Sequence, residues 1–185
     1  MAQPPFRPVH VALLALLGAV VAAVLLPGRV ERAEPADVLL ALQAARGPTL
    51  PPPGRAGAAS ATAVTRYGKE TLADVIDGAA EAYLTRGFTA AAFATYAFGL
   101  PDAPPVEVAA EAHRFKTEAG AEAQAAAERP RRAQPLAGLP GAFSDGSVLV
   151  ARAGRELLKL TLLSPGAGGS DALAALASAW TKERP

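Results

Sequence analysis

An apolar run near the N-terminus restricts what this chain can fold into more than any other feature. Residues 9–26 begin with Val9 and end with Leu26, and residues 11–26 carry no charge. A helix over that shorter stretch would be about 24 Å long, slightly less than the roughly 30 Å hydrocarbon core of a bilayer. The run has no polar face and precedes a Pro-rich stretch, which argues against a buried core helix. We therefore predict that it enters a membrane.

The run is either an uncleaved membrane anchor or the apolar region of a signal peptide. Cleavage after Ala23 would leave the apolar residues 24–26 on the mature end, and cleavage near Ala33 would follow charged residues, a poor context. These two features favour an anchor. Its position at the start of the chain predicts that the C-terminal part is extracytoplasmic, or secreted or periplasmic if the N-terminus is removed.

Composition narrows the function classes. The chain has no cysteine, which excludes disulfides, thiol catalysis and iron–sulfur ligation. Its net charge of +1 gives no electrostatic case for nucleic acid as a partner. The heavy use of Ala, Pro, Gly and Arg is typical of a GC-rich bacterial genome. We expect no cofactor.

The sequence divides into three parts. Residues 1–30 form the signal peptide or anchor, and residues 31–63 a short helix at 35–46 followed by a Pro/Gly/Ala-rich tether. The remainder, residues 64–185, is long enough for a single domain with one core.

Hydrophobic periodicity predicts the elements of that domain. Four strands are expected at residues 89–98, 106–115, 147–153 and 156–163. Helices are expected at residues 71–86, at 117–129 with Thr117 as cap, and at the C-terminus, where Leu173, Leu176 and Trp180 share a face. This order predicts an α+β fold: an antiparallel sheet of about four strands with helices packed on one face, preceded by the N-terminal hydrophobic helix.

The stretch at residues 67–88 carries a recognisable pattern. Its residues are Tyr67, Leu72, the run Ile76-Asp77-Gly78-Ala79-Ala80-Glu81, Tyr83 and the pair Gly87-Phe88. In these positions the chain resembles domain-of-unknown-function family 6599, a family of exported bacterial domains, over about residues 64–182. One departure is Val75, where the family often has an aromatic residue. The resemblance implies an exported α+β domain and carries no activity.

The same stretch supplies the candidate site. On the predicted helix, Asp74, Asp77 and Glu81 lie on one side, opposite the apolar residues. Like charges at this spacing destabilise a helix slightly, and Gly78 among them costs about 1 kcal/mol relative to Ala. A glycine here suggests close approach of another segment, a ligand or a cation held by carboxylates. Ordinary packing with charge pairing is the simpler interpretation.

A further candidate is His113, since the other of the two histidines, His10, borders the apolar run. A lone histidine on the polar side of a strand is usually exposed or structurally satisfied, and zinc would then need carboxylate ligands. A triad of Ser144, Asp145 and His113 is formally available, but no nucleophile-elbow motif accompanies it.

These observations favour a membrane-tethered or exported bacterial domain that is not an enzyme. Its partners would be the membrane, through residues 9–26, and an unidentified envelope protein or small ligand at Asp74, Asp77, Gly78, Glu81 and His113. The alternative is an extracytoplasmic enzyme or metal-binding domain that uses the face of Asp74, Asp77 and Glu81. A purely structural envelope module is a third option. No catalytic residue is assigned, because no mixed set of acid, base and nucleophile converges in the sequence.

Overall fold

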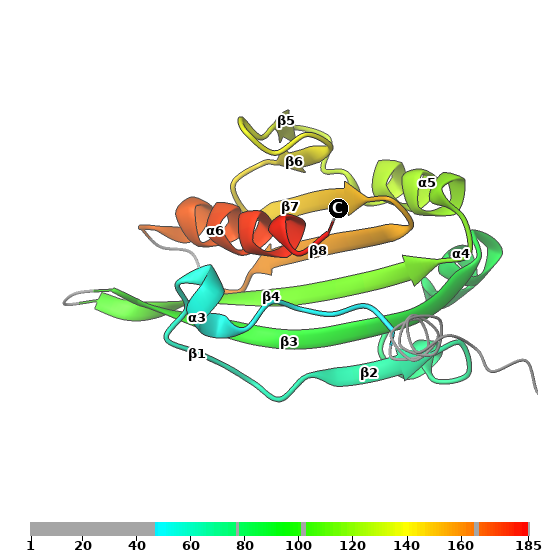
Figure 1. The fold of residues 1–185 in the computed structure, drawn as a ribbon, viewed down its shortest axis with the longest axis horizontal. Helices are drawn as coiled ribbons and strands as arrows, with labels where there is room; N and C mark the ends of the chain where they lie inside the picture. Colours follow the sequence, from blue (N-terminus) through cyan, green and yellow to red (C-terminus); the bar gives the residue numbers. More distant parts are fainter. Residues whose placement is uncertain (1–46, 77, 101–102, 165–166, 185) are drawn as a thin grey trace, which may run out of the picture. The chain divides into compact units, whose positions relative to one another are not determined.

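One antiparallel sheet organises the part of the chain that this computed structural model describes, residues 47–76, 78–100, 103–164 and 167–184 (Figure 1). The predicted N-terminal hydrophobic helix and the predicted helix at residues 35–46 lie outside these ranges. Within them, no helix is long and apolar enough to cross a membrane.

The sheet has eight strands in the order β1-β3-β4-β8-β7-β6-β5, and β2 shares with β1 the outer edge of β3. The strands are β1 (Ser60–Ala61), β2 (Thr65–Gly68), β3 (Phe88–Leu100), β4 (Ala103–Phe115), β5 (Gln134–Pro135), β6 (Ala142–Ser144), β7 (Val148–Ala153) and β8 (Glu156–Leu162). The helices are α3 (Pro53–Ala56), α4 (Ala80–Thr85), α5 (Glu118–Glu128) and α6 (Gly169–Lys182), with a single 3₁₀ turn, η1 (Leu72–Asp74).

The long pair β3 and β4 forms the centre of the sheet. The two strands run antiparallel from the pair Phe88↔Phe115 to the pair Leu100↔Ala103, with a register shift near each end. Their runs of Ala, Val, Thr and aromatic residues suit a pleated surface, because small and large side chains interleave across neighbouring strands.

Alternate residues of each strand point to opposite faces of the sheet, and both faces are packed. On the face that we call the α6 face, Val108 and Ala110 of β4 pack with Leu173 and Trp180 of α6. On the opposite face, the α5 face, Phe115 of β4 packs with side chains of α5, β7 and β8. These are Ala121, Val150 and Leu157.

The predicted strands are present, but the predicted architecture is wrong. The four expected strands correspond to β3, β4, β7 and β8, yet the sheet has eight strands and its helices lie on both faces. The additional strands have two to four residues each, too few for alternation to reveal them. Neighbouring residues buried in pairs, such as Leu157-Leu158 and Leu149-Val150, are the sign of a sheet covered on both sides.

The helix predicted at residues 71–86 is also wrong. The segment contains η1, then Gly78, then α4, so it is not one continuous helix. Gly78 has φ +66°, a left-handed conformation that interrupts helical geometry and that glycine adopts readily. Thr71 does not cap a helix either, because its Oγ1 accepts a hydrogen bond from the Gly68 N–H at 3.1 Å.

The predicted helix at residues 117–129 and the predicted hairpin are confirmed. Thr117 caps α5 by accepting a hydrogen bond from Gly120 N–H at 3.1 Å. The hairpin of β7 and β8 is entered through Asp145, whose Oδ1 accepts hydrogen bonds from Ser147 N–H and Val148 N–H at 2.9 and 2.8 Å. These two backbone donors hold the pKa of Asp145 below its ordinary value.

Part of the Pro/Gly/Ala-rich stretch expected to be a tether is packed against the sheet. Helix α3 contacts α6, and β1 pairs with β3. The Tyr96 hydroxyl donates a hydrogen bond of 2.6 Å to the carbonyl of Pro51, and burial raises the pKa of this phenol to about 12. The packed unit therefore includes the residues from 47 onward.

The junction between α4 and α5 predicts one strongly destabilising substitution. A Cβ at Gly120 would collide with the backbone carbonyl of Arg86. We expect Gly120→Ala to lower the free energy of unfolding by about 1–3 kcal/mol, because backbone on both sides must shift. The matched control is Gly54→Ala, where a Cβ meets nothing within 4 Å; its stability should be unchanged or higher by up to about 1 kcal/mol. Thermal unfolding followed by circular dichroism compares them, and equal midpoints would contradict the prediction.

Candidate functional site

The candidate residues from the sequence do not form one site. Asp74 lies in η1 and Glu81 at the start of α4, and both side chains are exposed. Asp77 lies outside the described residues. His113 is buried in β4, on the α5 face of the sheet.

The reason for Gly78 differs from the one predicted. A Cβ at this position would meet nothing within 4 Å, so no segment of the described structure approaches the backbone closely. The positive φ explains the glycine instead. Gly78 and Glu81 line a depression of about 380 Å³ whose other residues are Ala82, Thr85 and Arg86.

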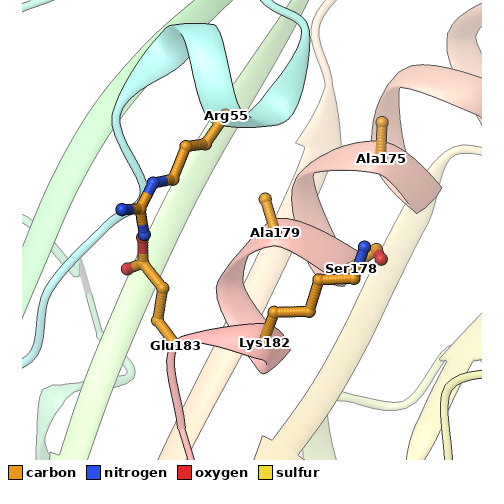
Figure 2. Close-up of a pocket in the computed structure, with 6 residues that line it drawn as sticks. All are labelled: Arg55, Ala175, Ser178, Ala179, Lys182 and Glu183. Carbon is orange, nitrogen blue, oxygen red and sulfur yellow. The ribbon is translucent and has the colours of Figure 1, made fainter.

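A larger hollow lies between α3 and the outer side of α6. Figure 2 shows the side chain of Ala179 between Lys182 and the ion pair of Arg55 with Glu183, whose atoms are 2.9 Å apart, and Ala175 further along α6. Its volume is about 450 Å³. Arg55 is paired with Glu183, which leaves Lys182 as the other charged side chain of the lining.

The strongest polar cluster involves His113, although its neighbours were not candidates. The imidazole is fully buried in contact with Tyr83, Phe88 and Phe93, with ring centroids 5.0, 6.2 and 5.6 Å away. Its Nε2 lies 3.4 Å from Oε2 of Glu111, without hydrogen-bond geometry. Within the described part of the chain, neither ring nitrogen has a hydrogen-bond partner.

Next to this imidazole, Glu128 at the end of α5 collects three donors. The Tyr83 hydroxyl donates to its Oε1 at 2.7 Å, the Gln124 amide donates to the same oxygen at 2.8 Å, and Lys159 Nζ lies 2.8 Å from Oε2. Arg86 donates in turn to Oε1 of Gln124 at 2.6 Å. The network joins α4, α5 and β8 at one point on the α5 face.

The pKa directions follow from these contacts. Burial acts to raise the pKa of Glu128, but the hydrogen bonds from Lys159 and Tyr83 outweigh it and lower the pKa. Burial acts to lower the pKa of Lys159, but Glu128 and the charge of Glu111 raise it. The pKa of the Tyr83 phenol is strongly raised, by burial first and then by its bond to Glu128.

This cluster has the residue types of a catalytic site but not the access of one. Glu111 and His113 resemble a carboxylate that orients an imidazole, yet the imidazole has no exposed surface and cannot reach a substrate. Among the described residues, no group of three or more His, Cys, Asp or Glu side chains is placed to hold a metal ion.

No spacing in the sequence brings together Glu111, Gln124, Glu128 and Lys159, because they come from three separate elements. One signal was available in Lys159, a charge between the leucines of β8. Alternation places it on the same face as Leu157, towards α5, where a buried charge needs a partner.

Compared with known proteins, the chain matches no protein-family model, no curated protein and no solved structure. The resemblance to domain-of-unknown-function family 6599 therefore stays a prediction.

The Glu128 network predicts a specific loss of stability in acid. In the folded protein the pKa of Glu128 is below its ordinary 4.5. The ionised carboxylate therefore adds to the free energy of unfolding above pH 4.5, and this stabilisation is lost as the pH falls through the folded pKa. Glu128→Gln should lower the free energy of unfolding by about 1–3 kcal/mol at pH 7 and flatten its decline in acid.

Denaturant unfolding between pH 7 and pH 3 measures this effect. The matched control is Glu122→Gln, on the exposed side of the same helix, which should keep the steeper decline of the unchanged protein. A Glu128→Gln curve parallel to that of the unchanged protein would show that the network does not govern acid stability.

Proposed function

We propose that this chain is a membrane-tethered or exported bacterial domain that binds a partner outside the cytoplasm and catalyses no reaction. The binding surface is part of the α5 face, beyond the polar cluster. We call this region the open half; it consists of Thr95 and Ala97 of β3, Glu107 and Ala109 of β4, and Thr161 and Leu163 at the end of β8.

The observation that carries the proposal is a contrast between the two faces at this end of the sheet. On the α6 face, Tyr96, Val108 and Leu160 are 1, 0 and 0% exposed. On the open half, the side chains of the same strands are half-buried or exposed, and Leu163 is 51% exposed. Helices α4 and α5 gather at the other end, where β4 finishes (Figure 1).

The side chains of the open half suit a protein surface better than a small-molecule pocket. Thr95, Ala97, Ala109 and Thr161 are small, so a partner backbone can approach the sheet closely. The two cavities described above lie elsewhere, beside α6 and α4. The fully buried imidazole argues against catalysis next to this surface.

The apolar run at residues 9–26 supports the compartment in this proposal. It lies outside the described residues, so its support comes from the sequence alone. A tethered domain meets envelope partners at high effective concentration, which makes a flat binding surface of modest affinity sufficient.

Site-specific photo-crosslinking in the native membrane tests the proposal. We expect p-benzoylphenylalanine at Glu107 or Leu163 to give one discrete adduct with an envelope protein, because these exposed positions belong to the open half. The matched controls are Ala123 and Ala126, exposed on α5, which should give no such adduct. Adducts of equal yield from all four positions, or from the two control positions only, would refute the open half as the binding surface.

A further inference from the structure

We propose that Glu111, with the aromatic side chains of Phe93 and Tyr67 beside it, is a recognition site for a basic side chain of the partner protein. The cation would be the guanidinium of an arginine or the ammonium of a lysine on a segment laid across the open half. This inference rests on the proposed function and adds the chemistry of the ligand.

The negative charge of Glu111 is less well compensated by nearby donors than that of Glu128. Glu128 receives three donors within 2.8 Å, whereas the contact found for Glu111 is the longer one to His113, at 3.4 Å. Lys159 is the register neighbour of Glu111 across β4 and β8 and its charge acts on both carboxylates, but its short contact, 2.8 Å from Nζ to Oε2, is with Glu128. The Glu111 side chain is 21% exposed at the border of the open half.

The aromatic side chains complete a site for an organic cation. Phe93 is the register partner of Glu111 across β3 and β4, on the same face. The Tyr67 ring stands edge-on to Phe93, with centroids 5.2 Å apart, and both side chains are only half-buried. A cation beside a carboxylate and over an aromatic face is attracted both by the negative charge and by the quadrupole of the ring.

His113 explains why the carboxylate is held at this point. A fully buried imidazole without a hydrogen bond is costly, and an apolar residue would fill the same position at less cost. Its Nε2 lies 3.4 Å from Oε2 of Glu111, on the buried side of the carboxylate. We assign His113 as a positioning residue that keeps the carboxylate turned towards the open half.

The same residues disfavour other ligands. A divalent metal needs several hard ligands, and the described residues offer no group of three acidic or histidine side chains. An anion would need a cation with unused capacity, whereas Lys159 lies between Glu128 and Glu111. A singly charged organic cation fits one exposed carboxylate flanked by aromatic rings.

Selective labelling makes the test direct, because the chain has two histidines and His113 is the one within the described residues. The full chain in detergent micelles, labelled with ¹⁵N-histidine, is titrated at constant pH with N-acetyl-arginine amide and N-acetyl-lysine amide. N-acetyl-citrulline amide is the neutral isostere. We expect a saturable shift of the His113 signal with both basic probes and about tenfold weaker binding of the citrulline probe, the effect of one charge-assisted hydrogen bond.

Variants separate this site from general charge attraction. Glu111→Gln should weaken binding of the arginine probe about tenfold, and Phe93→Leu, which keeps every charge, by several-fold. Glu122→Gln removes an exposed carboxylate on α5 and should leave the affinity unchanged. Thermal unfolding of each variant confirms that it is folded.

Equal affinity of the Glu111→Gln variant and the unchanged protein, or equal binding of arginine and citrulline probes, would overturn the inference. If basic probes fail to bind while Glu107 and Leu163 still crosslink to a partner, the open half stands and its cation chemistry is wrong. If basic probes bind through Glu111 but no crosslink forms from the open half, the cation site stands and the proposed surface fails.

Discussion

The central antiparallel pair of β3 and β4 imposes the constraint on which the rest of the structure depends. Each strand has 13 residues, and neighbouring residues point to opposite faces except at the register shifts near the two ends. A side chain of β4 is therefore assigned by its position either to α6 or to α5. Both faces carry apolar side chains that must be shielded from water, and helices therefore lie on both sides of the sheet.

The same alternation places polar and charged side chains of β4 and β8 on the α5 face. His113 and Glu111 occupy alternate positions of β4, and Lys159 faces Glu111 from β8. A charge in this partly covered layer is stable only with a partner, because the energetic cost of desolvating it exceeds what packing returns. The end of α5 provides that partner in Glu128, and α4 contributes Tyr83. The cluster thus fixes the positions of α4 and α5 relative to the sheet.

A division of roles follows for the two carboxylates. Glu128 is surrounded by donors and stabilises the fold, whereas Glu111 has one longer contact and an exposed edge. The Glu128 network holds the covered end of the α5 face together, and the open half is the surface that we propose for a partner. The α6 face has no such division, because its side chains from Ala94 to Phe98 and from Val106 to Ala112 are buried throughout.

Local sequence signals determined the positions of the main strands and of helix α5. Aromatic residues located β3, alternation located β4, a turn signal located the hairpin of β7 and β8, and the Thr117 cap located α5, because these patterns depend on nearby residues only. Tertiary structure decided the rest. The positive φ of Gly78, which explains the glycine, is a property of the folded backbone. The two-residue edge strands β1 and β5 exist only because they pair with β3 and β6. The cluster of Tyr83, His113, Gln124, Glu128 and Lys159 comes from four elements, so only their packing, and no spacing in the sequence, brings it together.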